Sequence, residues 1–341
     1  MFLFAVLSTC FKNDNPLRMW YNQSANNLNI WTDPRRNRST PSNEDYNKWS
    51  QNTIPIGNGF IGANIFGEIK NELLTFNELT LREGGPSASR PNYNGGNNVE
   101  KGQNGTTFRK IQQLFSEHKD DEAGTLCNQL IGDEEGYGTY LEFGEIYIDF
   151  EVDETKATDY VRWLDLDTAI SYVQYKYENA TLTREYFASH PDNAIVIHYN
   201  TSKGVIPTFS IHFETRVSTS FLSITALDST IDIFGSLKDN QLMMAMKIIG
   251  STTSGHVEAK NGKLTVSNTN DIYFYITAAT DYKNIYPNYR TGETAKELQN
   301  KLFERKQNGL KKGFSTIREN HLHDYQKLFN RVSLDLDNKP S

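Results

Sequence analysis

The feature that most constrains the fold of this chain is a long stretch, from Tyr140 to about Tyr282, with an almost unbroken β pattern. Four segments combine β-branched and aromatic side chains most densely, residues 146–150, 171–177, 194–199 and 272–276. Such side chains pack well on a pleated surface, and the Gly, Asn, Asp and Ser residues between the segments are typical of turns. We therefore predict a mostly β fold, a large two-sheet sandwich with short inserted helices and a C-terminal helical segment.

A glycine-dense segment precedes the β region. Glycines occupy positions 57, 59, 62 and 67, too close together for a helix, and they predict a turn between short strands. The segment also contains Gly-x-Gly-x-x-Gly, the spelling of a dinucleotide-binding motif, which needs a preceding apolar strand and a following helix. Because Pro55 and the β-branched residues after Gly59 oppose that helix, we do not expect a nucleotide site here.

A long polar loop, residues 77–96, follows the short apolar segment 72–76. Loops of this length inside a compact domain are often functional. We predict that a substrate rim or an interdomain contact is formed by Asn58, Asn77, Glu78, Arg82 and Glu83. The alternative for Asn77 and Glu78 is turn stabilisation by hydrogen bonds from side chain to backbone, and it stays open.

Helical periodicity occurs in two places. Residues 107–131 predict two short helices, with apolar stripes formed by Phe108, Ile111, Leu114 and Phe115, and by Ala123, Leu126, Cys127 and Leu130. Near the C-terminal end we predict a helix from Glu293 to Gln307 and a second one ending near Asn330. The second carries one apolar stripe, formed by Ile317, His321, Tyr325, Phe329 and Val332. Either the sandwich or a neighbouring domain would cover this stripe.

Charge and ligand-type residues exclude several classes of function. The chain has 35 Lys and Arg against 42 Asp and Glu, a net charge of −7. We expect no nucleic-acid partner, because phosphate binding needs clustered Lys and Arg. No Cys or His cluster has ligand spacing, and His321 and His323 face different sides of a helix, so we expect no metal and no cofactor.

The first residues resemble an export signal. Met1 to Val6 is a short apolar run, and the next four residues, Leu7 to Cys10, resemble a bacterial lipoprotein cleavage box. A complete signal also carries a basic residue before the apolar run, and none is present. A clipped export signal over residues 1–16 and a ragged gene start both explain this pattern. The first predicts an extracellular or periplasmic protein with a lipid anchor on Cys10.

Several segments, taken in order, resemble the glycoside hydrolase family 95 α-L-fucosidases. Residues 54–67 resemble the opening "LPIGNG…GAMVFGG" of that family, and residues 76–86 resemble its "LNExTLWxGGP". Further matches follow in the family's order, at residues 143–150, 164–169, 183–192, 279–282 and 321–336. Arg82 and Glu83 stand where the family has Trp followed by Ser or Thr, a departure that bears on substrate preference if this loop borders the sugar pocket.

The resemblance implies a domain plan. Residues 17–285 would form an N-terminal β-super-sandwich, and residues 286–341 a helical linker to an α/α barrel absent from this sequence. Family members invert configuration without metal as they hydrolyse terminal α-linked L-fucose, chiefly 1,2-linked, or in some cases L-galactose. Inversion needs an acid and a base. In the family, the acid Glu and the Asn and Asp groups that act on water lie in the barrel. The resemblance therefore implies that this chain has no catalytic residue.

The function implied is that of a scaffold and active-site rim, with fucosylated glycans bound through the full-length enzyme. Three alternatives stay open: a free-standing carbohydrate-binding module, the N-domain of an α-L-galactosidase, and a small hydrolase with an unrecognised site. The sequence contains no Gly-x-Ser-x-Gly nucleophile elbow that would support the last of these.

Overall fold

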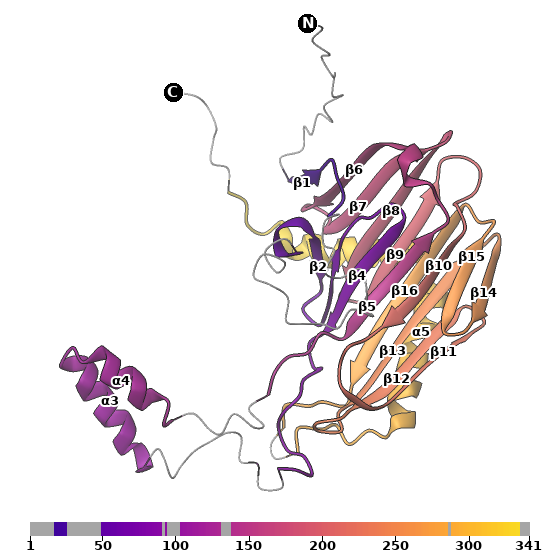
Figure 1. Cartoon of the computed structure of the whole chain (residues 1–341). Coiled ribbons are helices and arrows are strands. Elements are labelled where there is room, and N and C mark those ends of the chain that lie inside the picture. Colours follow the sequence, from indigo (N-terminus) through magenta and orange to yellow (C-terminus); the bar gives the residue numbers. More distant parts are fainter. Residues whose placement is uncertain are drawn as a thin grey trace, which may run out of the picture.

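Two antiparallel sheets face each other and form a sandwich (Figure 1). The computed structural model describes residues 17–25, 49–90, 93, 103–130, 138–285 and 288–334. Residues 1–16, with Cys10 and the predicted export signal, lie outside these ranges. The predicted mostly β, two-sheet fold with few helices is confirmed within them.

The larger sheet has nine strands among the described residues. In spatial order they are β1 (Arg18–Tyr21), β6 (Ala157–Asp165), β7 (Ile170–Tyr177), β8 (Ala180–Ser189), β9 (Ala194–Thr201), β16 (Asp271–Thr280), β13 (Met243–Thr252), β12 (Thr230–Leu237) and β11 (Thr219–Leu227). Neighbouring strands from β6 to β9 are sequential, which is the pattern of hairpins joined by short turns. The sheet is therefore built mainly from local pairings.

The smaller sheet has seven strands in the described part of the chain. Their order is β14 (His256–Lys260), β15 (Lys263–Ser267), β10 (Phe209–Glu214), β5 (Gly144–Phe150), β4 (Asn71–Glu78), β3 (Ile61–Ile65) and β2 (Ile54–Gly57). The predicted turn between short strands is the β2–β3 hairpin, and no helix follows it before β4. This geometry is incompatible with a dinucleotide-binding turn.

Alternating side chains build the core between the sheets. On β3, Ile61, Ala63 and Ile65 are buried, whereas Gly62 and Asn64 face outward. A buried polar cluster crosses this core: Arg184 on β8 donates from Nη1 to Oε2 of Glu72 on β4, at 3.2 Å, and the Tyr186 hydroxyl donates to the same oxygen at 2.9 Å. An ion pair and the tyrosine hydroxyls bonded to it therefore join the two sheets inside a mainly apolar layer.

Helix α5 (Ala295–Phe329) forms a third layer on the outer face of the larger sheet. Thr294 and Glu297 form a capping box at its start. The first helix was predicted to end at Gln307, but α5 runs past that residue, and its irregular backbone lies at Gly313. There φ is 72° and ψ is 166°, a conformation open only to glycine. Of the predicted apolar stripe, Ile317 and His321 are buried against the larger sheet. Tyr325 and Phe329 are half-buried, and Val332 is 84% exposed.

Helices α3 (Thr106–Ser116) and α4 (Asp120–Cys127) confirm the two predicted short helices and stand apart from the sandwich (Figure 1). Ile111 and Leu114 pack against Ala123 of the other helix. Phe108 and Phe115, predicted in the same stripe, are instead about half exposed. Helix α4 has eight residues against eleven in α3, and only its Ala123 is fully buried, so it covers the centre of the α3 stripe and not its ends.

Candidate functional site

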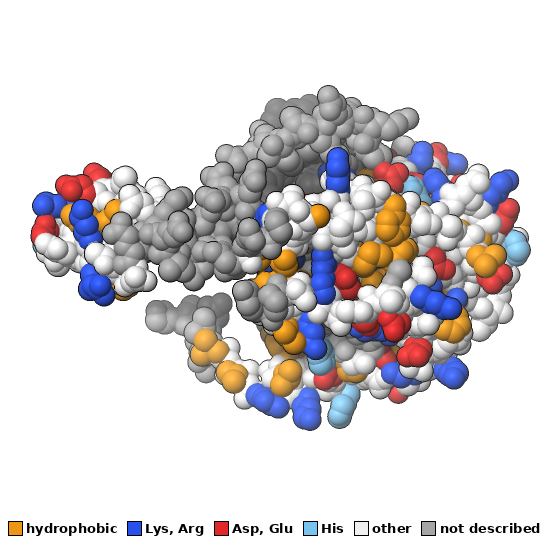
Figure 2. Space-filling model, turned by 90° about the horizontal axis from the view of Figure 1, so that it is seen from below, with side chains coloured by type: hydrophobic (Ala, Val, Ile, Leu, Met, Phe, Trp, Pro, Cys, Tyr) orange, Lys and Arg blue, Asp and Glu red, His pale blue; other side chains and the backbone are white. Residues whose placement is uncertain are grey.

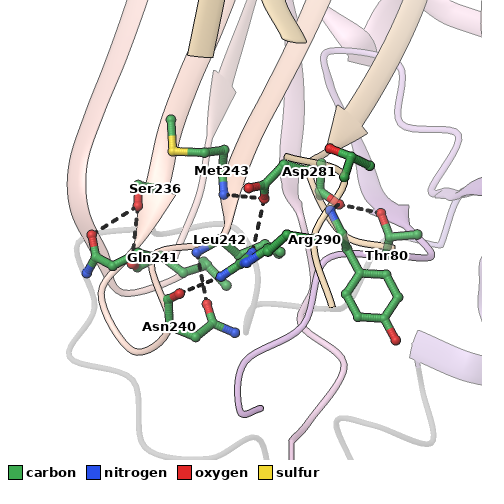
Figure 3. Close-up of polar contacts among 12 residues, drawn as sticks. Thr80, Ser236, Asn240, Gln241, Leu242, Met243, Asp281 and Arg290 are labelled. Atoms are coloured by element: carbon green, nitrogen blue, oxygen red, sulfur yellow. Dashed lines mark hydrogen bonds and ion pairs between the residues drawn. The ribbon is translucent and has the colours of Figure 1, made fainter. Parts of the chain in front are cut away.

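Three segments far apart in sequence meet at one end of the sandwich (Figure 3). The first is the end of β4 with the loop after it (residues 78–90), and the second is the β12–β13 turn with its strand ends (236–243). The third is the end of β16 with the residues that follow it (280–285 and 288–292). We call these three segments the end loops. Asn240 joins the first two, because its Nδ2 donates to the carbonyls of Arg82 (3.0 Å) and Gly84 (2.8 Å). The end loops include the glycine-rich part of the predicted functional loop.

Asp239 fixes the first end loop in place. Its carboxylate accepts two bonds from Arg90, both at 2.8 Å, and one from the backbone N–H of Gly84 at 2.7 Å. The Arg90 hydrogen bond holds the pKa of Asp239 below its usual range. Bidentate Arg–carboxylate pairs are geometrically specific, so this contact sets the position of the loop at Gly84.

A second ion pair orders the segment after β16. Arg290 donates to Oδ1 of Asp281 at 3.0 Å and to the carbonyl of Asn240 at 2.5 Å, and the backbone N–H of Met243 also donates to Asp281 (Figure 3). Burial raises the pKa of Asp281 and outweighs the opposing effect of Arg290. The two end loops from β12–β13 and β16 are thus tied together.

Arg82 lies between two tyrosine rings at the centre of the end loops. Its guanidinium carbon is 4.5 Å from the ring centroid of Tyr140 and 5.5 Å from that of Tyr282. Its Nη1 also donates to the Tyr282 hydroxyl at 3.2 Å. Cation–π contacts with two rings hold the flexible side chain in one orientation.

A pocket of about 170 Å³ opens beside Arg82. Its described lining combines glycine backbone, amides, aromatic rings and charge, from Arg82, Glu83, Tyr93, Asn240, Tyr282, Asn288, Tyr289 and Arg290 among others. The rings of Tyr282 and Tyr289 are nearly parallel, with centroids 6.5 Å apart. Flat rings beside amide and guanidinium donors are suited to a sugar, which presents both C–H faces and hydroxyls.

The structure brings only two of the five predicted site residues together in this pocket, Arg82 and Glu83. Asn77 and Glu78 were predicted in the loop, but they are the last residues of β4. The strand extends through them because Glu78 pairs with Ile61 on β3, and the next residue still donates its N–H to the carbonyl of Phe60. Asn77 is exposed in a neighbouring groove.

Glu78 is fully buried, so its side chain cannot reach a rim. Its carboxylate accepts from the backbone N–H of Thr80 (2.9 Å) and from the Thr80 hydroxyl (2.7 Å). Burial raises the pKa of Glu78. The stabilisation of a turn by side-chain bonds, the alternative left open from sequence, describes this residue.

Asn58 also holds a turn. Its Oδ1 accepts from the N–H groups of Phe60 and Ile61, both at 2.9 Å, and its Nδ2 donates to the carbonyl of Ser189 at 2.9 Å. The first two bonds close the β2–β3 hairpin, and the third joins it to the end of β8 in the opposite sheet. Asn58 is therefore placed away from the pocket, in a structural contact.

Sequence patterns did not identify Asp239, Asn240, Tyr289 and Arg290. They lie more than 140 positions after Arg82 and share no motif with it, so only the fold brings them near. Asp281 and Tyr282 did carry a signal, because they belong to the matched segment 279–282.

Other site classes find no support in the described ranges. No group of three His, Cys, Asp or Glu side chains there is placed to hold a metal ion. Nor does any helix in that part of the chain have the length and apolar character needed to cross a membrane. On the face in Figure 2, Lys and Arg side chains are interspersed with Asp and Glu over the described surface.

Two known proteins similar in sequence to this chain carry α-fucosidase names. This chain is 27% identical over 310 residues to "Alpha-L-fucosidase 2" of Arabidopsis thaliana, and the alignment covers 83% of this chain and 35% of that protein. It is 25% identical over 316 residues to "Probable alpha-fucosidase A" of Aspergillus niger, covering 90% and 38%. The chain thus spans little more than a third of the length of these relatives.

Solved structures show the same fold in a more distant protein. A "Putative kojibiose phosphorylase from human microbiome" superposes with a TM-score of 0.50 at 10% identity, over 81% of this chain and 35% of that one. The family description "Glycosyl hydrolase family 65, N-terminal domain" matches residues 19–285. The resemblance drawn from sequence was to family 95, and the match instead names a related glycosidase family. The common ground is the N-terminal domain of a glycoside hydrolase, and by this match the chain belongs to the family of glycosyl hydrolase family 65 N-terminal domains.

Proposed function

We propose that this chain is the non-catalytic N-terminal part of an inverting α-L-fucosidase of the family 95 type. In this proposal the sandwich supports an α/α barrel that supplies the catalytic groups, and the end loops form part of the rim around the substrate. The supporting observation is the ordered set of family 95 motifs, together with the α-fucosidase relatives over more than four fifths of the chain. The substrate would be a terminal α-1,2-linked L-fucosyl group, with an L-galactosyl group as the alternative.

The geometry of the pocket supports a non-catalytic role. Inverting glycosidases place two carboxyl groups roughly 6.5–9.5 Å apart, one as acid and one as base. The described lining of the pocket contains one carboxylate, that of Glu83. The nearby acids Glu78 and Asp281 are buried and already bonded to Thr80 and Arg290. A second, accessible carboxyl group for inversion would have to come from elsewhere.

The test compares this 341-residue chain with a longer protein that continues into the barrel. Both are incubated with 2'-fucosyllactose, and the released sugar is followed by proton NMR. We expect no release by the chain alone, and β-L-fucose as the first product of the longer protein. Turnover by the chain alone would refute the non-catalytic role, and α-L-fucose as first product would refute inversion.

A free-standing carbohydrate-binding module is the second candidate. It is favoured by the ring pair of Tyr282 and Tyr289 beside the exposed amide of Asn288, a set of groups that can bind sugars without a barrel. A glycan array with the isolated chain separates the two functions. Micromolar binding to fucosylated glycans would favour the module, and weak or absent binding there would favour the scaffold.

Export is proposed from sequence alone. The protein would be extracellular or periplasmic, and anchored through a lipid on Cys10 if the cleavage box is used. Metabolic labelling with a fatty-acid analogue in a bacterial host tests this, with Cys10→Ala as the matched variant. Equal labelling of both proteins would exclude a lipid on Cys10.

A further inference from the structure

Arg82 differs from the other arginines of the end loops in its charge balance. Arg90 is paired with Asp239 and Arg290 with Asp281. Among the described residues, no carboxylate forms an ion pair with Arg82, and its contacts are with two tyrosines. Its guanidinium carries five N–H donors, and one of them is used by Tyr282. A positive charge with several remaining donors therefore faces the pocket.

The position of that charge is fixed before any ligand binds. The rings of Tyr140 and Tyr282 flank the guanidinium, and a backbone bridge between Arg82 and Tyr140 fixes the ring on one side. A side chain that is already immobilised loses little entropy when a ligand binds, so the ligand binds more tightly. The planar fork of arginine also matches the two oxygens of a carboxylate.

We propose that the pocket beside Arg82 binds a pyranose ring that carries an anionic group, such as a uronate carboxylate or a sulfate ester. The ring would lie against Tyr282 or Tyr289, its hydroxyls would bond to the exposed amides of Asn284 and Asn288, and its anionic group would face Arg82. The pocket volume of about 170 Å³ is below the range of roughly 300–1,000 Å³ typical of drug-sized ligands, so it accommodates one ring and not a chain. This inference rests on the proposed function, since it takes the end loops to contact a glycan.

Glu83 gives the proposal an internal check. Its exposed carboxylate also lines the pocket and opposes an anion there, so it reduces affinity for the same ligand that Arg82 attracts. Neutralising the two residues one at a time should therefore change anion binding in opposite directions. A neutral sugar would respond much less to either change.

The experiment is calorimetric titration of this chain with three methyl glycosides at low salt. They are methyl galacturonoside, methyl galactoside 6-sulfate and neutral methyl galactoside, which distinguish a carboxylate from a sulfate and both from an uncharged ring. We expect at least one anionic glycoside to bind about tenfold tighter than the neutral one, as for one charge-assisted hydrogen bond. The preference should shrink as salt is added.

Variants assign the effect to the pocket. Arg82→Gln should remove most of the anionic preference. Glu83→Gln should increase it about two- to fivefold, as expected for the loss of one exposed like charge. Arg331→Gln changes an exposed arginine just after the end of α5 and should leave the preference unchanged. If Arg82→Gln lowers the melting temperature too far to be assayed, Glu83→Gln and the salt dependence still decide.

Equal affinity for all three glycosides, no measurable binding of either anion, or a preference that survives Arg82→Gln would overturn the inference. None of these outcomes bears on fucose release by the longer protein, which tests the proposed function. Conversely, failure of that protein to release fucose would leave the measured anion preference standing. The two proposals can therefore fail separately.

Discussion

Neutralising Glu68 should change how the stability of this chain depends on pH. Glu68 lies between β3 and β4, where its Oε2 accepts from the Ser24 hydroxyl at 3.1 Å. Burial, followed by repulsion from the carboxylate of Glu72, raises the pKa of Glu68 from 4.5 to about 7. A raised pKa means that the folded chain holds this proton more tightly than the unfolded chain does. Its contribution to stability is therefore complete below pH 4.5 and is lost as the pH rises through 7.

The magnitude follows from the two pKa values. A carboxyl group moved from 4.5 to about 7 changes the free energy of unfolding by about 3 kcal/mol across that interval. Glu68→Gln cannot titrate, so the difference in unfolding free energy between variant and wild type should shift by about this amount in favour of the variant. Urea unfolding followed by tryptophan fluorescence at pH 4.5 and at pH 7.5 measures the shift. Glu258→Gln removes one charge from an exposed position on β14 and is the matched control.

A difference between Glu68→Gln and wild type that stays constant within about 0.5 kcal/mol from pH 4.5 to pH 7.5 would refute the reasoning, since it is far below the shift expected from linkage. A shift of equal size in Glu258→Gln would also do so, because it would assign the effect to net charge. The contact with Ser24 gives a second check. Ser24→Ala removes a hydrogen bond that lowers the pKa of Glu68, so it should steepen the pH dependence.

Three further outcomes are expected. Arg184→Met should destabilise the chain by about 3–5 kcal/mol in urea unfolding, because it leaves the Glu72 carboxylate buried without its cation, and adding Glu72→Leu should restore part of that loss. Gly309→Ala should lower the melting temperature, since its Cβ would lie 2.7 Å from the ring of Tyr275, and overpacking of this kind costs about 1–3 kcal/mol. His321 has a pKa lowered by burial, so it stabilises the fold above pH 6.5 and this stability is lost at lower pH. His321→Gln should flatten that loss in a melting series from pH 7.5 to pH 5.

Each of these variants has a matched control. Arg331→Met changes an exposed arginine and should cost less than about 0.5 kcal/mol. Gly124→Ala lies in α4 with open space at its Cβ, so it should be neutral or stabilising by about 0.5–1 kcal/mol. His323→Gln changes an exposed histidine on the same helix and should leave the pH profile unchanged. Equal effects in a variant and its control would contradict the contact assigned to that variant.

The strands were predictable because their signal is local. The β-branched and aromatic side chains of segments such as residues 194–199 and 272–276 predict strands by themselves, and both segments are strands that pair with each other. The end of β4 was not predictable. Asn77 and Glu78 are polar, and only pairing with Ile61 and Gly62 on β3 shows that the strand continues through them.

The pocket was only half predictable, for a different reason. Arg82 and Glu83 stood out as a departure from a familiar motif, so their part of the lining was named from sequence. The residues opposite them, such as Asn240 and Arg290, arrive from turns whose polar composition is that of any surface loop. Their proximity depends on pairing between β12, β13 and β16, which no short segment encodes.

The break in α5 gives the third layer one joint. Strands in a sheet rotate by about 20–25° from one to the next, so a straight rod cannot lie flush against distant strands of the same face. Before Gly313, Leu302 packs with Ala279 on β16, and after it Ile317 packs with Phe187 on β8. The two ends of the helix thus lie against different strands of a twisted surface. A residue at position 313 that kept the helix straight would separate one end of α5 from the strands it packs against, and the buried contacts at that end would be lost.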